Sequence, residues 1–335
     1  MISAKAADEK LLTVSASPHV RSATTSRMIM LDVIISLCPA LIASVLIFGL
    51  RALAVTAVTV ASCMLSEYVS RKIMKRSNTL GDLSAIVTGM LLAFNLPSSI
   101  PFWMAALGGA IAIVIVKQFF GGIGENFVNP AITARIILLL SFSSAMSSWP
   151  VPRQGLMVKA VDAVTGATPL AVISEGSGSL PSLTDMFLGL RGGCLGETCA
   201  LALIIGGLYL IIRKVISPAI PLSFIGTVAV IMLIAKKGDF TALSYQILSG
   251  GLLLGAIFMA TDYSTSPISF KGKIIFGIGC GVITCLIRIF GSYPEGVSFS
   301  IIIMNILVPH IEKLTTPKPF GTPKKEKKAK EEAKA

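Results

Sequence analysis

The sequence predicts an all-α polytopic membrane protein with about ten transmembrane helices, and three observations carry that prediction. Of the 335 residues, 53% are hydrophobic and 14% are charged, and the mean hydropathy is +0.81, which is too apolar for a soluble globular protein. The chain contains many apolar runs of the roughly 20 residues that a membrane-spanning helix needs. The alternating pattern of a transmembrane β-barrel does not occur.

Glycine, proline and polar residues divide the apolar runs into candidate helices. We expect ten of them, over residues 28–49, 52–70, 82–96, 102–119, 130–146, 196–213, 218–236, 244–261, 273–291 and 296–312. The third and the fifth are short for a full span, which favours broken or tilted segments at these positions.

Positive charge orients these helices, because Lys and Arg concentrate on the cytoplasmic side of membrane proteins. With the N-terminus inside, all but seven of the 29 Lys and Arg residues fall on the inner side. The seven outer ones are Arg51, Arg153, Lys159, Arg191, Lys236, Lys237 and Arg288. We therefore expect both termini in the cytoplasm and the loop 147–195 outside. The basic residues form no patch among aromatic side chains, so nucleic acid is not an expected partner; membrane lipid is.

Two stretches follow the same pattern of a glycine, an apolar run and a polar break with proline. They are TGMLLAFNLPSSIPF (88–102) and SGGLLLGAIFMATDYSTSPIS (249–269). Each is followed by another helix and a glycine turn, which indicates two five-helix halves of opposite orientation. We accordingly divide the chain into a cytoplasmic segment 1–27, a first repeat 28–146, an outer loop 147–195, a second repeat 196–312 and a Lys-rich tail 313–335.

Polar residues at membrane depth are candidate functional groups because their burial in hydrocarbon is costly. Asn126, Asn129 and Arg135 follow a glycine-rich turn at the expected start of a helix, where free N–H groups favour an anion or an electron-rich ring edge. Helix capping alone would also explain the two asparagines. Asp262 ends the eighth expected helix and either contacts a cation or caps the break. Glu295 is a second carboxylate at the membrane edge, so both acids are candidates for an ion path.

The outer loop ends in a second glycine turn, LRGGCLGET (190–198). Arg191, Gly192 and Gly193 precede the sixth expected helix, and we expect Glu197 in its first turn. The turn would either support a phosphate group held nearby or serve as a flexible entry to the helix. The six cysteines form no CxxC pair, so a metal site within this chain is not expected.

The outer loop also contains VDAVTGATPL (161–170). A threonine hydroxyl on an exposed loop without a histidine is a poor nucleophile, which argues against hydrolase-type catalysis. Gly166 and Ala167 leave room for a modifying enzyme beside Thr168. The residues therefore favour Thr168 as a substrate for modification rather than as a catalyst.

The sequence DAVTGAT resembles the motif Asp, two variable residues, Ser or Thr, then Gly-Ala-Thr, at which a flavin transferase attaches FMN. Five further stretches resemble the family of the D-type subunit of the Rnf complex: SPHVRSATTSRMIMLDVIISLCPA, GGIGENFVNPA, GGCLGETCALALIIGGLYL, GAIFMATDYSTSP and YPEGVSFSIIIMN. The resemblance covers residues 17–312. It implies a phosphoester between FMN and Thr168, with Asp162, Thr165, Gly166 and Ala167 as the transferase recognition signal.

The resemblance further implies two inverted five-helix repeats similar to urea transporters, in the plasma membrane of a prokaryote. The chain would relay electrons in a pump that couples reduced ferredoxin and NAD to movement of Na⁺ or H⁺. Its partners would be Rnf subunits of the A, B, C, E and G types, including a second covalent-flavin subunit and iron–sulfur subunits. Some relatives also hold noncovalent riboflavin. Cys194 and Cys199 depart from the family pattern, which has small hydroxyl residues there.

Two alternatives remain from the sequence. One is the related B-type subunit of the Na⁺-translocating NADH:quinone oxidoreductase; the short N-terminus here favours the Rnf type. The other is a small-solute channel of urea-transporter type, since fold alone permits it. Within the favoured interpretation, Arg191 would stabilise negative charge on a reduced flavin at the outer face, and Arg135 would do so for a flavin nearer the inner face.

Overall fold

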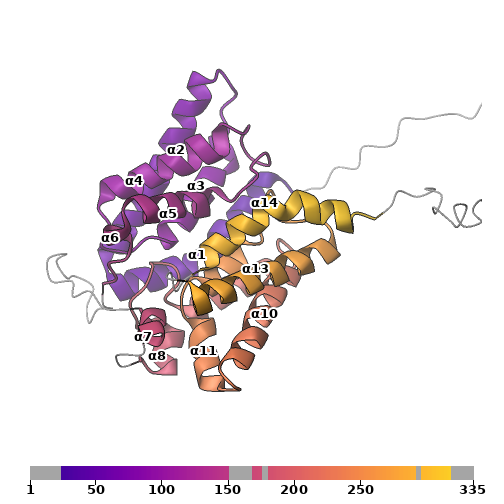
Figure 1. Cartoon of the computed structure of the whole chain (residues 1–335). Coiled ribbons are helices and arrows are strands. Elements are labelled where there is room, and N and C mark those ends of the chain that lie inside the picture. The colour runs from indigo at the N-terminus through magenta and orange to yellow at the C-terminus, as the bar shows by residue number, and fades with distance from the viewer. Residues whose placement is uncertain (1–23, 151–167, 176–179, 292–295, 318–335) are drawn as a thin grey trace, which may run out of the picture.

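The computed structural model describes residues 24–150, 168–175, 180–291 and 296–317. Its regular elements are helices, and each of the ten expected segments contains one (Figure 1). The first five segments form α1 (Ser26–Phe48), α2 (Leu50–Ile73), α3 (Ser84–Phe94), α4 (Phe102–Ala110) with the π-helix η2 (Ile111–Gln118), and α5 (Pro130–Ser141) with α6 (Ser143–Met146). The last five form α9 (Ala200–Ile212), α10 (Ala219–Ala235), α11 (Phe240–Leu248) with α12 (Leu252–Leu254) and η4 (Gly255–Met259), α13 (Phe270–Phe290) and α14 (Val297–Thr315).

Three short helices were not expected from the sequence. They are η1 (Leu80–Asp82), α7 (Pro169–Glu175) and α8 (Leu183–Leu188). The last two lie in the predicted outer loop, beside α11 (Figure 1). That loop is therefore partly a folded structure seated on the helix bundle.

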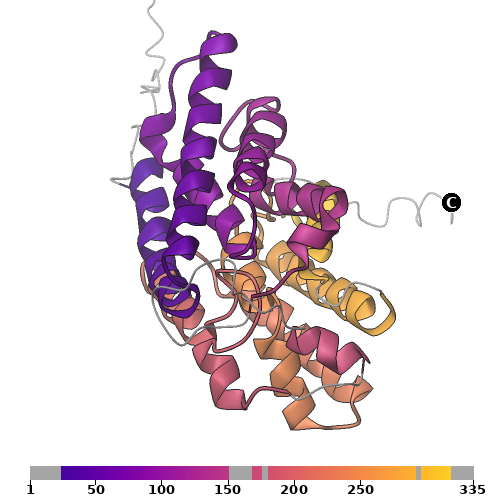
Figure 2. The ribbon, with the colours of Figure 1, turned by 90° about the vertical axis from the view of Figure 1, so that its left-hand side faces the viewer.

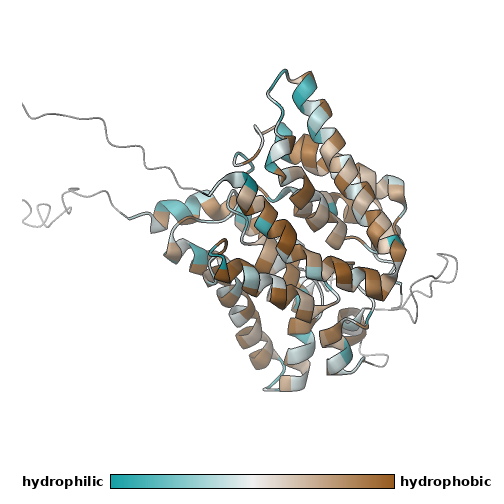
Figure 3. Cartoon of the chain, turned by 180° about the vertical axis from the view of Figure 1, so that it is seen from behind, coloured by the Kyte–Doolittle hydropathy of each residue, from teal (hydrophilic) through white to brown (hydrophobic). Residues whose placement is uncertain are grey.

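The chain is a membrane protein by the length and composition of its helices. Among the described residues, α1, α2, α13 and α14 are long and apolar enough to cross a bilayer, and the bent pair Phe240–Leu248 and Leu252–Met259 is a fifth candidate. Hydrophobic residues cover the middle of the bundle, and hydrophilic ones gather at helix ends (Figure 3). The other apolar helices are shorter than a full span, as expected for α3 and α5.

Among the expected helices that differ from the structure, two differ in ways that shape the candidate site. The helix expected over 244–261 is two helices bent by 62°, because Ser249, Gly250 and Gly251 interrupt it and Gly250 has a φ of +64°. The helix expected from residue 196 begins at Ala200. Residues before it pair instead with the chain after α3, where Gly196 N donates to Phe94 O at 2.9 Å.

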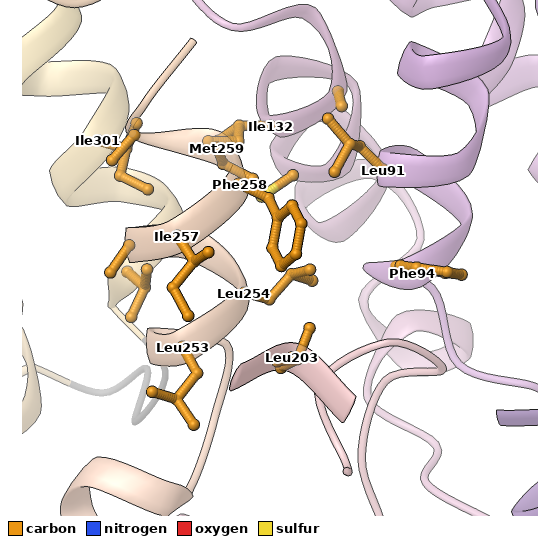
Figure 4. Close-up of a cluster of buried hydrophobic side chains, with 14 of the residues drawn as sticks. Leu91, Phe94, Ile132, Leu203, Leu253, Leu254, Ile257, Phe258, Met259 and Ile301 are labelled. Carbon is orange, nitrogen blue, oxygen red and sulfur yellow. The ribbon is translucent and has the colours of Figure 1, made fainter. Parts of the chain in front are cut away.

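The helices pack as two groups that meet at a shared core. In the first group α2 packs on α3 and α4, and in the second α10 packs on α13 and η4 (Figures 1 and 2). Contacts of α1 with α9 and of α5 with α14 join the groups. At the junction, buried side chains from α3, α9, η4 and α14 converge around Phe258 (Figure 4). The chain after α3 lies against this core, where Asn95 Nδ2 donates to Met259 Sδ at 3.4 Å.

Candidate functional site

Thr168 lies immediately before α7 and caps it. Its Oγ1 accepts a hydrogen bond from Ala171 N at 3.2 Å, and its carbonyl accepts one from Val172 N at 3.0 Å, the arrangement of a threonine N-cap. The expectation that Thr168 is exposed was wrong, since only 7% of it is accessible. Thr168 is buried because the helix that follows it, α7, packs on α11.

The proposed recognition signal for the transferase, Asp162, Thr165, Gly166 and Ala167, lies outside the described residues. Glu295, the second candidate for an ion path, does too.

The bend between α11 and α12 lies directly against α7. A Cβ on Gly250 would lie 2.8 Å from Leu170 Cδ1 and 3.3 Å from an Nη of Arg288. Arg288 itself donates to Gln246 O at 2.6 Å and to Ser249 O at 3.2 Å. It therefore places a guanidinium beside the segment that follows Thr168. The sequence indicated Arg288 only as one outer positive charge, since nothing in its local pattern marks the contact.

The glycine turn before α9 folds around its own charged residues. Arg191 is 2% exposed and donates to Glu197 O at 2.8 Å and to Thr198 O at 3.4 Å. Glu197 Oε1 accepts from Cys194 N at 3.2 Å. Because α9 begins at Ala200, Glu197 belongs to this turn, and its expected place in the first turn of the helix was wrong. Hydrogen bonds to carbonyl groups thus hold the Arg191 guanidinium inside the loop.

The two glycines of the turn differ in the space around them. A Cβ on Gly193 would lie 2.8 Å from Glu197 Oε1, whereas one on Gly192 would have its nearest neighbour, Trp149 Cβ, at 3.6 Å. Gly193 is therefore required for the close approach of the Glu197 carboxylate.

Arg135 joins this glycine turn and does not lie with Asn126 and Asn129, contrary to the grouping expected from the sequence. Its guanidinium donates to Ser298 Oγ on α14 at 2.5 Å and to Cys194 Sγ at 3.7 Å. A Cβ on Gly251 would lie 3.9 Å from Arg135 and 3.4 Å from Glu197 Oε2. Buried Arg135 and Glu197 thus both border the bend of the α11–α12 pair, so this bend is surrounded by charged and polar side chains.

Asn126 and Asn129 lie at a second site, a pocket near the start of α5. Its polar lining includes Lys117, Asn126, Asn129 and Asp262, and its apolar lining includes Val33, Leu91 and Phe258. Asn129 is the N-cap of α5, as the capping interpretation expected, because its Oδ1 accepts from Ala131 N and Ile132 N at 3.0 and 3.3 Å. Its Nδ2 also donates to Met259 O at 3.2 Å. The asparagine thereby fastens the end of η4 to the start of α5.

Asp262 organises the turn that follows η4. Its Oδ2 accepts from Ser264 Oγ at 3.2 Å and from Thr265 Oγ1 at 3.3 Å, and its carbonyl accepts from Ser266 N at 3.1 Å. Burial raises the pKa of the Asp262 carboxyl above its usual range, and the hydrogen bonds from Ser264 partly oppose that shift. The geometry supports the capping interpretation and also places an ionisable group at the pocket.

The sequence reasoning missed a buried ion pair beside this pocket. Lys117 Nζ lies 2.9 Å from Glu67 Oε2, and the two side chains are 2% and 0% exposed. Ser84 Oγ accepts from Lys117 at 2.6 Å, while Thr79 and Gln118 donate to Glu67 Oε1 at 2.7 and 3.1 Å. Both charges stand inside apolar runs, which by itself marks a functional candidate in a membrane protein. Lys117 and Ser84 also line the pocket, so the positively charged side chain of Lys117 forms part of the pocket wall.

Comparison with known proteins identifies the family of this chain. The family model described as NQR2, RnfD, RnfE matches residues 13–321. The chain belongs to this family. It is 48% identical over 326 residues to the D-type subunit of the Na⁺-translocating ferredoxin:NAD⁺ oxidoreductase complex of Acetobacterium woodii, covering 96% of this chain and 99% of that one.

Two further relatives are similar over nearly their full lengths. The D-type subunit of the proton-translocating ferredoxin:NAD⁺ oxidoreductase complex of Clostridium ljungdahlii is 42% identical over 328 residues, or 94% of this chain and 97% of that one. The D-type subunit of the ion-translocating oxidoreductase complex of Stutzerimonas stutzeri is 37% identical, with 88% and 91% covered. The name of the Acetobacterium relative specifies Na⁺ as the translocated ion, and that of the Clostridium relative specifies protons. The name of the Stutzerimonas relative does not specify the ion.

Proposed function

We propose that this chain is the D-type membrane subunit of an ion-translocating ferredoxin:NAD oxidoreductase complex, and that it relays electrons through FMN attached to Thr168. Family membership and 48% identity to a D-type subunit over nearly the whole chain support the first part. The chain is then an enzyme subunit that is not catalytic alone. It works with the other subunits of its complex, of the A, B, C, E and G types, and with a flavin transferase for maturation.

The observation that carries the flavin proposal is the final threonine of DAVTGAT, seated at the bend of the α11–α12 pair. Esterification leaves Thr168 Oγ1 with lone pairs, so its bond from Ala171 N remains chemically possible. FMN would supply electron transfer, and the ester would keep it from dissociating from the protein. Arg288 would place positive charge beside the attachment segment, and Arg135 and Glu197 would fix the bend on its other side. These residues fit a phosphate-bearing, redox-active group.

Two inverted five-helix repeats are the finer fold that we propose. The packing of α2 on α3 and α4 resembles that of α10 on η4 and α13. Each half also has a broken element, α3 ending before Asn95 in one and the α11–α12 bend in the other. Such breaks are typical of repeat-built membrane proteins, where they line sites at the repeat interface.

A second flavin, riboflavin held without a covalent bond, would suit the pocket beside α5. Flavin sites combine apolar walls with a few placed polar groups, and Phe258, Leu91, Asn126 and Lys117 are of these kinds. Acid precipitation separates the two cofactors, because covalent FMN stays with the protein while riboflavin enters the supernatant. Asn126→Ala, which leaves the Glu67–Lys117 pair intact, should lower the riboflavin released per complex and leave the protein-bound flavin unchanged.

The attachment test uses the whole complex co-expressed with its transferase. The native chain should show flavin fluorescence on a denaturing gel, and Thr168→Val should abolish it together with ferredoxin:NAD activity. Thr184→Val, which changes an exposed threonine of α8, is the matched control and should retain both. A native chain without covalently bound flavin would contradict the proposal. Loss of flavin with full activity would instead favour a structural role, and solute flux without electron transfer would favour the channel alternative.

The location that we propose is the plasma membrane of a prokaryote, with Thr168 on the outer side. The coupling ion is either Na⁺ or H⁺, since relatives of both kinds are similar to this chain. Activity measured against sodium concentration in sodium-depleted vesicles distinguishes them, because only Na⁺ coupling predicts saturation.

A further inference from the structure

A separate pocket lies where α9 gives way to α10, next to the start of α13. Its polar lining consists of Lys214, Ser217, Thr261, Tyr263, Ser266 and Lys273, and its apolar lining includes Ile211 and Ile220. Among the described residues, neither Thr168 nor those around the α11–α12 bend line it. Two segments separated by about fifty residues therefore bring two ammonium groups to one hollow.

The electrostatics of this pocket favour an anion. Lys214 and Lys273 line it, and no carboxylate is among the described residues of its lining. The 17-residue helix α10 also begins here, and its first-turn N–H groups lack carbonyl partners within the helix. Only Ala219 N has a side-chain acceptor at this end among the described residues, Ser217 Oγ at 3.4 Å. The helix dipole adds to the positive potential of the lysines.

Ser266 gives independent evidence for a ligand. It is only 8% exposed, yet it lines the pocket, and its hydroxyl makes no hydrogen bond within the described part of the chain. Thr265, its neighbour, bonds to Asp262 instead. The Ser266 oxygen is not among the fully buried atoms without a partner, so it opens toward space that a partner can occupy, and polar groups with so little exposure are normally hydrogen-bonded. A donor that faces a basic hollow without a protein partner is suited to an oxygen of a bound anion.

Apolar side chains around the pocket indicate the source of that anion. Ile212, Ile268 and Phe270 flank its lysines in sequence, and they are 76%, 83% and 67% exposed. In a membrane protein such residues lie against lipid chains, while Lys side chains reach the headgroups. Basic pockets between membrane helices are typical binding places for anionic headgroups.

We propose that this pocket binds the phosphate group of an anionic phospholipid, with Lys214 and Lys273 as its cations and Ser266 as a neutral donor. The acyl chains would lie along Ile212, Ile268 and Phe270. The pocket shares Thr261 and Tyr263 with the pocket beside α5. The Tyr263 hydroxyl donates to Val215 O in the shared wall, so a bound lipid would brace the wall between the two.

Photo-crosslinking in the purified complex tests the site at peptide resolution. A photoreactive phosphatidylglycerol should label peptides that contain residues 211–220 or 261–275, and a photoreactive phosphatidylcholine should label them weakly. Lys214→Gln/Lys273→Gln should lower the phosphatidylglycerol labelling roughly tenfold or more, since each lysine contributes to headgroup attraction. Ser266→Ala should lower it less.

The matched control is Lys236→Gln/Lys237→Gln at the opposite end of α10. Lys237 follows its helix with a φ of +53°, much as Lys214 follows α9 with a φ of +58°. The control pair should leave labelling unchanged, and both pairs should preserve the elution volume of the complex. Equal labelling of native protein and Lys214→Gln/Lys273→Gln would overturn the proposal. Displacement of the lipid by inorganic phosphate at equal concentration would also overturn it, in favour of a free-phosphate site.

Discussion

Leu170 and Gly250 are in contact: a Cβ at Gly250 would come within 2.8 Å of Leu170 Cδ1. This contact seats α7, and with it Thr168, on the bend of the α11–α12 pair. Leu170 is 3% exposed, so the contact is fully buried. It connects the proposed attachment residue to a helix more than seventy residues later in the chain.

Gly250→Ala should therefore loosen the seat of α7. The added methyl group would meet Leu170 and Arg288, and the φ of +64° disfavours any side chain, so we expect a loss of about 1–3 kcal/mol in stability. Thermal unfolding of the purified complex measures it. Gly226→Ala in α10 is the control, because its new Cβ would meet nothing within 4 Å and helix propensity favours alanine. Equal melting of both variants would show that the contact is unimportant.

Breaking the Glu67–Lys117 pair on one side should be costly. Glu67→Gln or Lys117→Met leaves an uncompensated buried charge, with an expected loss of about 3–5 kcal/mol, and the double variant should recover much of it. A double-mutant cycle by thermal unfolding measures the coupling. For comparison, Asp32→Asn removes a more exposed pair, in which Arg213 is 53% exposed, and should cost at most about 1 kcal/mol. Additive single losses would contradict the account of this pair.

Asp262 should make stability depend on pH. Burial raises the pKa of its carboxyl, so the folded protein holds this proton more tightly than the unfolded chain. The stabilising contribution is therefore full below the ordinary carboxyl pKa and is lost as pH rises through the raised pKa. Asp262→Asn should remove this dependence, so that it is more stable than native protein at alkaline pH and comparable in acid. A native complex that gains stability over that range relative to Asp262→Asn would contradict the assigned direction.

Labelling with a membrane-impermeant thiol reagent should report topology from introduced cysteines. Native Cys194 and Cys199 are 0% and 9% exposed and should stay unlabelled from either side. Thr184→Cys, at an exposed position in α8, should react from outside intact cells. Lys72→Cys, exposed at the end of α2, should react only after the membrane is opened. The reverse pattern would invert the proposed orientation.

Local sequence patterns predicted where helices form, because apolar runs and their breakers are features of a few neighbouring residues. They did not predict the bend at Gly250, since a glycine inside an apolar run is compatible with a continuous helix. They also misplaced the start of α9, which depends on pairing of Gly196 with Phe94 a hundred residues earlier. Helix existence was thus predictable, and the breaks at the core were not.

In the candidate site too, features of neighbouring residues were predictable from the sequence, and contacts between distant residues were not. The proposed modification of Thr168 follows from its motif, whereas its burial accompanies the packing of α7 on α11, where Leu170 meets Gly250. Arg135 and Asn129 are neighbours in sequence and lie at different sites, because six residues of helix separate their side chains by about 9 Å along the axis. Partners such as Glu67 and Lys117 are fifty residues apart, so no local spacing indicates them.

Peptide mass spectrometry of the native chain, purified with its complex, decides whether Thr168 carries FMN. We expect one peptide containing residues 161–170 that carries the mass of esterified FMN, with fragment ions assigning it to Thr168 and none to Thr165. The same peptide from Thr168→Val should be unmodified. An unmodified Thr168 in a complex that still transfers electrons from ferredoxin to NAD would contradict the account.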